Sequence, residues 1–161
     1  MAADKLFRKP SLDVIQGDTL GPMYGVIGAN ATAAYMIPGK RVMFDTNDNE
    51  VKEGGTDPSD NIGILGYESS PLAFKPATRD TAYAVGDHVA IHNTPGMRFR
   101  GWLKAGSGAV NPGDTLMGTD ASGNFQIAAG DPQVGIMKAR AIESITPNGS
   151  TNTACWMQYI G

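Results

Sequence analysis

Glycine and proline interrupt this chain so often that long helices are excluded along most of its length. Its 161 residues include 21 glycines, about twice the usual share, and 10 prolines. Both residue types end helices and mark turns. The short segments between them are rich in Val, Ile, Leu, Met and aromatic residues. Short apolar segments bounded by turns at intervals of about 8–12 residues predict the strands of a β-barrel or β-sandwich.

We therefore expect an all-β fold, with a compact body that is a β-barrel of short antiparallel strands. A chain of 161 residues is long enough to bury a core and to form one domain. We expect an extended N-terminal arm over residues 1–11, a single all-β body over 12–161, and an acidic loop over 45–60. The expected strands cover residues 12–15, 23–27, 34–37, 41–45, 62–68, 72–75, 88–92, 97–103, 115–117, 124–128, 134–145 and 153–160.

Two parts of the chain, residues 36–66 and 110–138, share one pattern of turns and strands. Pro38-Gly39 in the first part aligns with Pro112-Gly113 in the second, an offset of 74 residues. Further along, the offset becomes 72, and IGIL at 62–65 aligns with VGIM at 134–137. Each part has a Pro-Gly turn, a strand, a polar turn, a second strand and an apolar-Gly-apolar strand. The match predicts duplicated hairpin units within one barrel-like body.

The C-terminal part predicts a hairpin between residues 139–146 and 153–160. Its turn contains Asn148-Gly149, which is a strong local signal for two antiparallel strands. Alternation in the second strand places Cys155, Met157 and Tyr159 on one face, and one face of this strand is expected to lie in the core.

A search for catalytic or metal-binding residues finds no convincing pattern. His88 and His92 would share a strand face about 13 Å apart, too far for one metal ion, and are expected to be two partly exposed histidines. Cys155 is expected to be a packed small side chain. The segment that begins at Asp45 resembles a calcium loop, but Glu50 stands where that loop needs glycine, so a polar turn is expected. No nucleophile elbow or phosphate loop is present. We expect no enzyme activity, cofactor or metal.

Overall charge and hydropathy exclude further classes. The net charge of −3 and a pI near 5.2 argue against nucleic acid as the main partner. No apolar run approaches the roughly 20 residues of a membrane span, and no secretory leader is expected. A single cysteine excludes a disulfide within the chain and favours synthesis in a reducing cytoplasm.

Charged residues gather in a few places, which makes them candidates for partner binding. The acidic loop and one expected strand carry opposite charges, and they contain Asp48, Glu50 and Glu53, and Arg98, Arg100 and Trp102. These sets are either ordinary solvated surface or complementary patches that meet between copies in a ring or trimer. The arm carries the basic and apolar residues Lys5, Leu6, Phe7, Arg8, Lys9 and Pro10. We expect the arm to bind a partner surface, for example by adding a strand to a neighbouring sheet.

The motif Gly113-Asp114-Thr115-Leu116, followed by Val134-Gly135-Ile136 and Ala139, resembles the capsid decoration or cement proteins of tailed bacteriophages. The motif covers residues 82–143, and the high glycine content and the arm fit the same family. The resemblance implies a β-barrel or β-tulip body, a homotrimer, and binding to the major capsid protein through the arm. It also implies a location on the capsid exterior of the virion, after synthesis in the host cytoplasm. Two alternatives stay open: another virion β-protein of the tail, head-completion or fibre type, and a trimeric β-barrel enzyme.

Overall fold

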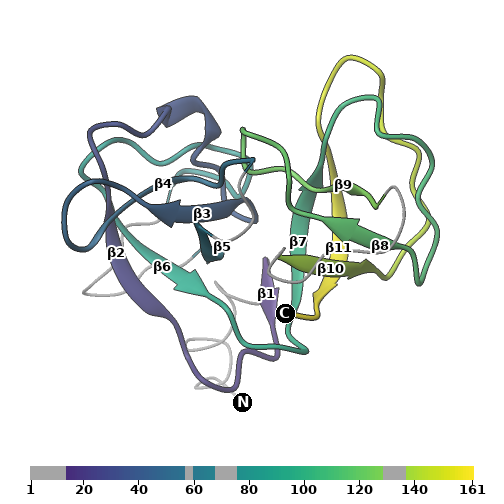
Figure 1. The fold of residues 1–161 in the computed structure, drawn as a ribbon, viewed down its shortest axis with the longest axis horizontal. Coiled ribbons are helices and arrows are strands. Elements are labelled where there is room, and N and C mark those ends of the chain that lie inside the picture. Colours follow the sequence, from purple (N-terminus) through teal and green to yellow (C-terminus); the bar gives the residue numbers. More distant parts are fainter. Residues whose placement is uncertain (1–13, 57–59, 68–75, 129–136) are drawn as a thin grey trace.

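The computed structural model describes residues 14–56, 60–67, 76–128 and 137–161, and within them the regular structure is β apart from one short 3₁₀ turn, η1 (Ala33–Tyr35) (Figure 1). The all-β prediction is confirmed. The strands are β1 (Ile15–Gln16), β2 (Met23–Ile27), β3 (Arg41–Phe44), β4 (Glu50–Glu53), β5 (Asn61–Leu65), β6 (His88–His92), β7 (Arg98–Leu103), β8 (Thr115–Met117), β9 (Gln126–Ile127), β10 (Lys138–Ala141) and β11 (Thr153–Tyr159).

Two expectations about local structure are wrong. The strand expected at 34–37 is the 3₁₀ turn, closed by hydrogen bonds from the Tyr35 N–H to the Thr32 carbonyl (2.8 Å) and from the Met36 N–H to the Ala33 carbonyl (3.0 Å). The acidic loop expected at 45–60 contains strand β4, because Val51 is buried in the core and fixes the alternation of its charged neighbours. The expected arm 1–11 and the expected strand 72–75 lie outside the described residues.

Strands β2 to β6 form a closed barrel in the order β2-β4-β3-β5-β6, which we call the first barrel (Figure 1, left). Its pairs are antiparallel except β2 with β4, where Val26 and Ile27 run parallel to Glu50 and Val51. The barrel encloses a core of Ile27, Met36, Val42, Val51, Leu65, Tyr83, Val89 and Ile91.

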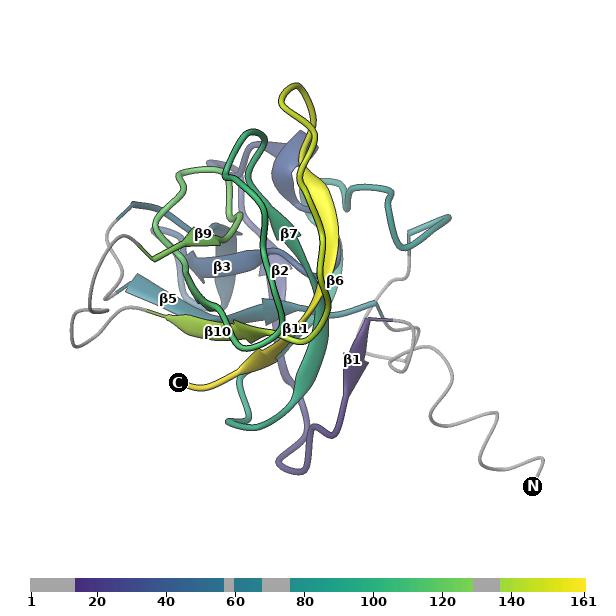
Figure 2. The same cartoon turned by 90° about the vertical axis from the view of Figure 1, so that its right-hand side faces the viewer.

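The remaining strands form a six-stranded sheet in the order β1-β7-β11-β10-β8-β9. This sheet curls until Phe125, just before β9, makes a parallel bridge with Leu103 of β7. Two hydrogen bonds accompany the bridge, from the Phe125 N–H to the Trp102 carbonyl and from the Lys104 N–H to the Phe125 carbonyl, both 2.8 Å. Strands β7 to β11 therefore form a second barrel, and β1 is added at the edge of its sheet (Figure 2).

The two barrels have the same topology. The second barrel has the order β7-β9-β8-β10-β11. Adding five to each strand number of the first barrel, β2-β4-β3-β5-β6, gives the same order. The register agrees as well, because Val42 faces Glu53 and Leu116 faces Ile127, each residue 74 positions further on. Gly25 faces Val89 in the first barrel, as Gly101 faces Cys155 in the second. The internal similarity thus extends over five strands and not only over a hairpin.

The third strand of the shared unit lies four residues from its expected place. Val42 faces Gly63 in the first barrel, and Leu116 faces Ala139 in the second, so the third strands are offset by 76 residues rather than 72. The apolar-Gly-apolar pattern therefore aligned the wrong residues, because similar letters can match without the same strand pairing.

The C-terminal hairpin forms as expected between β10 and β11, with Ala139 opposite Tyr159 and Ala141 opposite Met157. Cys155 and Met157 are fully buried in the core of the second barrel, and Tyr159 packs against it. Burial, with a smaller contribution from Glu143, raises the pKa of the Cys155 thiol to about 12. Cys155 is therefore a packed core side chain, as predicted.

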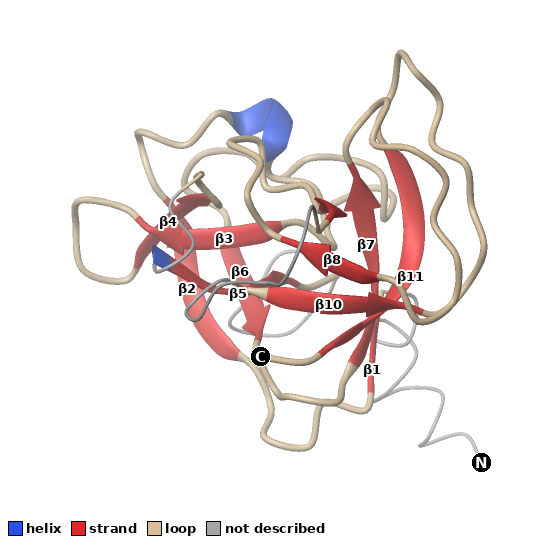
Figure 3. Cartoon of the chain, turned by 45° about the vertical axis from the view of Figure 1, so that its right-hand side comes forward, coloured by secondary structure: helices blue, strands red, loops and turns tan. Residues whose placement is uncertain are grey.

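A fully buried arginine joins the two barrels. Arg41 is the first residue of β3, and this end of the strand lies beside β8 (Figure 3). Its guanidinium and Nε donate to the Asn124 carbonyl (2.9 and 3.2 Å), the Asp120 carbonyl (2.6 Å), the Asn61 Oδ1 (2.8 Å) and the Gly55 carbonyl (3.3 Å). These five bonds use every N–H that an arginine side chain carries. Arg41 therefore holds the β8–β9 turn of the second barrel against the first barrel.

Further contacts at the same junction surround this side chain. The Arg41 guanidinium lies 5.6 Å from the centre of the Phe125 ring, and the neighbouring Lys40 donates to the Ser122 carbonyl (3.1 Å). Burial lowers the pKa of Arg41 to about 10, although the charge of Asp120 opposes the shift. Arg41 is therefore charged at neutral pH, and its hydrogen bonds compensate for its lost hydration.

Candidate functional site

A row of polar and basic side chains crosses the outer face of the second barrel. Arg98 on β7 faces Gln158 on β11, and Gln158 faces Arg140 on β10. Alternation places these three residues on the solvent side, and both arginines are exposed while their strand neighbours Phe99 and Ala139 are fully buried. We call Arg98, Gln158 and Arg140 the basic row. Figure 2 shows the strands β7, β11 and β10 that carry it.

Arg100 and Trp102 lie on the same face of β7 but are already engaged within the chain. The Arg100 guanidinium pairs with the Asp80 carboxylate (2.7 Å) and lies 5.2 Å from the centre of the Trp102 ring. The Trp102 indole N–H donates to the Pro38 carbonyl (2.9 Å) of the first barrel. The structure thus brings Arg98, Arg100 and Trp102 together on one face, as alternation predicted. Arg98 is the exposed arginine of this set, whereas Arg100 is paired with Asp80.

The β3–β4 turn over residues 45–50, which we call the acidic turn, is built around a buried carboxylate. Asp45 accepts hydrogen bonds from the Asn30 side-chain N–H (3.0 Å) and the Asn30 backbone N–H (3.2 Å), and it pairs with Lys52 (3.4 Å). Burial would raise the pKa of Asp45, but the hydrogen bonds from Asn30 and Thr46 lower it to about 2. Asp45 is therefore a structural anion that shapes the turn.

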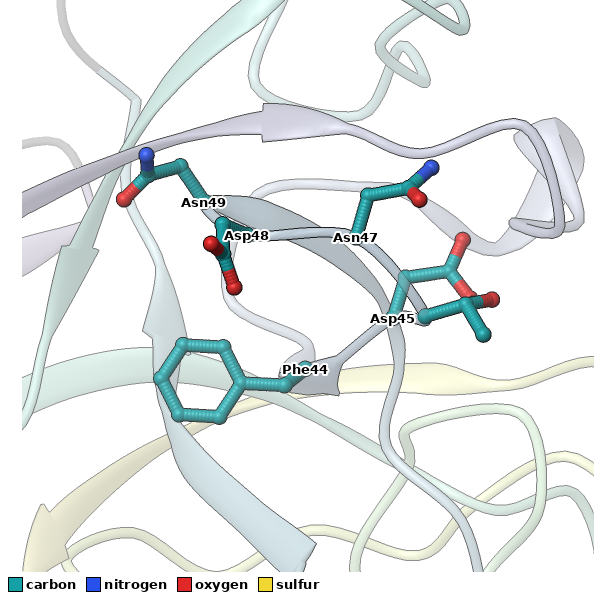
Figure 4. A pocket seen from close by; sticks show the side chains of 6 residues that line it. Phe44, Asp45, Asn47, Asp48 and Asn49 are labelled. Atoms are coloured by element: carbon teal, nitrogen blue, oxygen red, sulfur yellow. The ribbon is translucent and has the colours of Figure 1, made fainter.

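An open hollow of about 450 Å³ lies on the acidic turn, lined by residues 44–49. The Phe44 side chain is 59% exposed, which is unusual for a residue of this size. Figure 4 shows the Asp48 carboxylate on the side of the turn that faces the Phe44 ring, whereas the Asn47 amide points to the other side. The turn therefore presents an aromatic ring and a carboxylate side by side to solvent.

The other acidic residues expected to bind a partner are occupied within the chain. The Glu50 carboxylate accepts a hydrogen bond from the Asn47 side chain (2.9 Å), and the Glu53 carboxylate accepts one from the Thr32 N–H (2.9 Å). Asp48 is the exposed carboxylate of the predicted set. Residues 5–10 of the arm lie outside the described residues.

The acidic turn and the basic row do not meet within one chain. They belong to different barrels, and no ion pair between described residues joins Asp48, Glu50 or Glu53 to Arg98. Sequence reasoning missed Arg140, because its position beside Arg98 depends on strand pairing through Gln158. It also missed the exposed apolar side chains of Leu20, Met23 and Tyr24 where the chain enters the first barrel.

His92 is buried, which corrects the expectation that both histidines are partly exposed. Its Nδ1 lies 2.5 Å from Asp18 Oδ2, and Thr94 donates to the other Asp18 oxygen. Asp18 lies between β1 and β2, and Thr94 lies between β6 and β7, so these contacts tie together the two connections that cross between the barrels. Thr94 bonds to Asp18 directly and not through His92, so this cluster differs from a nucleophile–histidine–acid relay. The cluster of Asp18, His92 and Thr94 therefore has a structural role.

Replacing Asp18 with asparagine is expected to reduce stability by about 1–3 kcal/mol at pH 7, because buried donors lose a charged acceptor. Burial would raise the pKa of Asp18, but the hydrogen bonds from Thr94 and His92 lower it below 3.8 overall. A carboxylate whose pKa is lower in the folded state than in the unfolded state stabilises the fold at pH values above its unfolded-state pKa. This contribution is lost as the pH falls through its folded-state pKa. Urea unfolding at pH 7 and pH 3 should therefore show a smaller difference between Asp18→Asn and the parent at pH 3. Equal differences at both pH values would contradict this prediction, and Asp48→Asn, in the exposed turn, is the control.

Within the described ranges, no group of three or more His, Cys, Asp or Glu side chains could hold a metal ion. No helix in the described part of the chain is long and apolar enough to cross a bilayer.

Neither protein-family models nor curated protein sequences match this chain.

Proposed function

We propose that this protein is a structural component of a tailed-phage virion, which binds the outside of the assembled capsid as a homotrimer and stabilises the shell. Its partners would be the major capsid protein and further copies of itself. Two features of the body support this role: two closed cores in tandem and surfaces of opposite charge on the two barrels. A body of this kind can bridge neighbouring subunits.

The residues of the resemblance have scaffold roles that suit such a body. Gly113 has a φ of 95° at the entry to β8, Asp114 accepts a hydrogen bond from the Asn111 N–H (2.8 Å), and Leu116 is fully buried. The described residues of the motif thus belong to the scaffold of the second barrel, and binding is assigned to the surface and the arm.

The observation that carries the proposal is the position of β1, which follows residues 1–13 in the sequence. β1 is the edge strand of the sheet and pairs with β7 through Ile15 opposite Phe99 and Gln16 opposite Arg98. An N-terminal arm that starts at a sheet edge beside a basic face can add to a partner's strand while the body rests on the shell. Several such contacts on one shell add their free energies, and binding to the assembled shell alone stabilises it by mass action.

The test is addition of the purified protein to undecorated, expanded capsids of the source virus. We expect saturable binding on the capsid lattice and a higher temperature of capsid disruption. Deletion of residues 1–11 should weaken this binding while the circular dichroism and unfolding of the body stay unchanged. Absence of both binding and heat protection would reject the proposed function.

A further inference from the structure

The chain contains one example of a barrel turn that binds an arginine from another barrel. The β8–β9 turn receives Arg41 through the carbonyl oxygens of Asp120 and Asn124, with the Phe125 ring beside the guanidinium. This turn therefore combines oxygen acceptors and an aromatic ring, which together suit a guanidinium.

The equivalent turn in the first barrel is the acidic turn between β3 and β4. Both turns join paired strands with the same register at an offset of 74 residues. Both contain a residue with positive φ at the equivalent position, 64° at Asn49 and 75° at Gly123. The two turns are thus corresponding parts of the duplicated unit.

One residue changes how a guanidinium could bind to the acidic turn. Gly118 of the second barrel lacks a side chain, and the Arg41 side chain lies where a Cβ at Gly118 would be. The equivalent residue in the first barrel is Phe44, whose ring is exposed. A guanidinium therefore cannot pass beneath the acidic turn, but it can lie on the Phe44 ring within reach of the Asp48 carboxylate (Figure 4).

The arginines best placed to bind there are those of the basic row. The residue equivalent to Arg41 in the second barrel is Thr115, so the internal contact cannot repeat through β8. Arg98 and Arg140 are exposed and flank Gln158, about 10 Å apart at the usual strand spacing. No ion pair between described residues involves either of them.

We propose that the acidic turn of one copy binds the basic row of a second copy, with Arg98 or Arg140 placed between the Asp48 carboxylate and the Phe44 ring. The two surfaces lie on different barrels, so the contact is heterologous and forms a ring when its rotation closes. This interface rests on the self-assembly part of the proposed function, and it is independent of capsid binding.

The test is sedimentation equilibrium of the full chain alone, over a range of protein concentrations and at low and high salt. We expect the parent protein to self-associate, less strongly at high salt. Asp48→Asn, Phe44→Ala, and Arg98→Glu combined with Arg140→Glu should each weaken association about tenfold or more. The matched control for Asp48→Asn is Thr151→Lys, which makes the same change of charge on the exposed loop between β10 and β11 and should leave association unchanged.

A charge exchange gives the sharper result. Asp48→Arg alone and the double arginine variant alone should be monomeric, whereas an equimolar mixture of the two should associate into species that contain both variants. In the mixture the two changed surfaces are complementary to each other, and the unchanged acidic turn of one variant can still bind the unchanged basic row of the other. Thermal unfolding of each variant checks that the body is folded.

Three outcomes would overturn the inference. The first is a parent protein that stays monomeric at all concentrations, and the second is an equal effect of Asp48→Asn and Thr151→Lys. The third is loss of association in Arg8→Glu but not in the double arginine variant, which would make the arm the occupant of the acidic turn. Capsid binding by a monomeric parent would reject this interface and leave the capsid-binding part of the proposed function standing.

Discussion

Replacing Arg41 with methionine is expected to lower the free energy of unfolding by about 3–5 kcal/mol, because removing one member of a buried polar network leaves the others without a partner. The lost bonds are those to the carbonyls of Asn124, Asp120 and Gly55 and to the Asn61 side chain. Urea unfolding followed by tryptophan fluorescence measures the loss, since Trp102 bonds across the same junction to Pro38.

Two further variants test the physical reason. Arg41→Lys keeps the charge but cannot donate five bonds in a planar arrangement, so most of the loss should remain. Lys104→Met removes a half-exposed partner of Asp120 at the edge of the same junction, and it should cost at most about 1 kcal/mol. A loss below about 1 kcal/mol in Arg41→Met would show that the network does not stabilise the junction.

Replacing Gly39 with alanine is expected to cost about 3–5 kcal/mol in total. Gly39 has a φ of 89°, which strains any residue with a side chain. A Cβ at this position would also overlap the Arg100 carbonyl oxygen, which belongs to β7 of the second barrel. The variant should therefore separate the barrels as well as strain the turn, and differential scanning calorimetry should show a much lower unfolding temperature.

Gly113 is the matched control, because it occupies the same Pro-Gly turn in the second barrel. Its φ is 95°, but nothing lies within 4 Å of an added Cβ. Gly113→Ala should therefore cost only the backbone strain, about 1–2 kcal/mol. Equal losses at the two glycines would mean that close packing of the barrels at Gly39 contributes nothing to stability.

Gly39 and Gly113 occupy the same Pro-Gly turn of the duplicated unit but have different surroundings. Each barrel uses the Pro-Gly turn to enter its central strand, β3 or β8. In the first barrel this turn faces the junction, where a Cβ added at Gly39 would meet the Arg100 carbonyl of β7. In the second barrel the equivalent turn faces solvent. One local motif thus has a scaffold role in both places and a packing role in only one.

The sequence predicted most strand positions, because alternating apolar residues between Gly and Pro turns report local structure directly. Strands β2, β6 and β8 have the expected bounds, whereas the strand expected at 34–37 is wrong, because a short apolar run fits a strand or a tight turn equally well. The hairpin similarity was visible through the Pro-Gly turns. The similarity of the outer strands was hidden, because residues at equivalent positions of the two barrels, such as Val89 and Cys155, share only their burial.

The candidate surfaces were predicted only in part. Alternation in one strand placed Arg98, Arg100 and Trp102 together, since that information is local. Pairing of β7 with β11 and of β11 with β10 added Arg140 to the same surface, and pairing depends on residues far apart in the chain. The roles of Glu50 and Glu53 also depend on distant partners.

By itself the sequence determined an all-β chain, its turn positions and the packing of Cys155, because strand alternation and turn chemistry are set by neighbouring residues. Only the tertiary structure decided that the chain forms two barrels of one topology, that Arg41 and His92 are buried, and which charges stay exposed. The physical reason is that burial and charge pairing are properties of surfaces that meet, and which surfaces meet depends on residues far apart in the chain, such as Met23 paired with Ile91 and Arg41 bonded to Asn124.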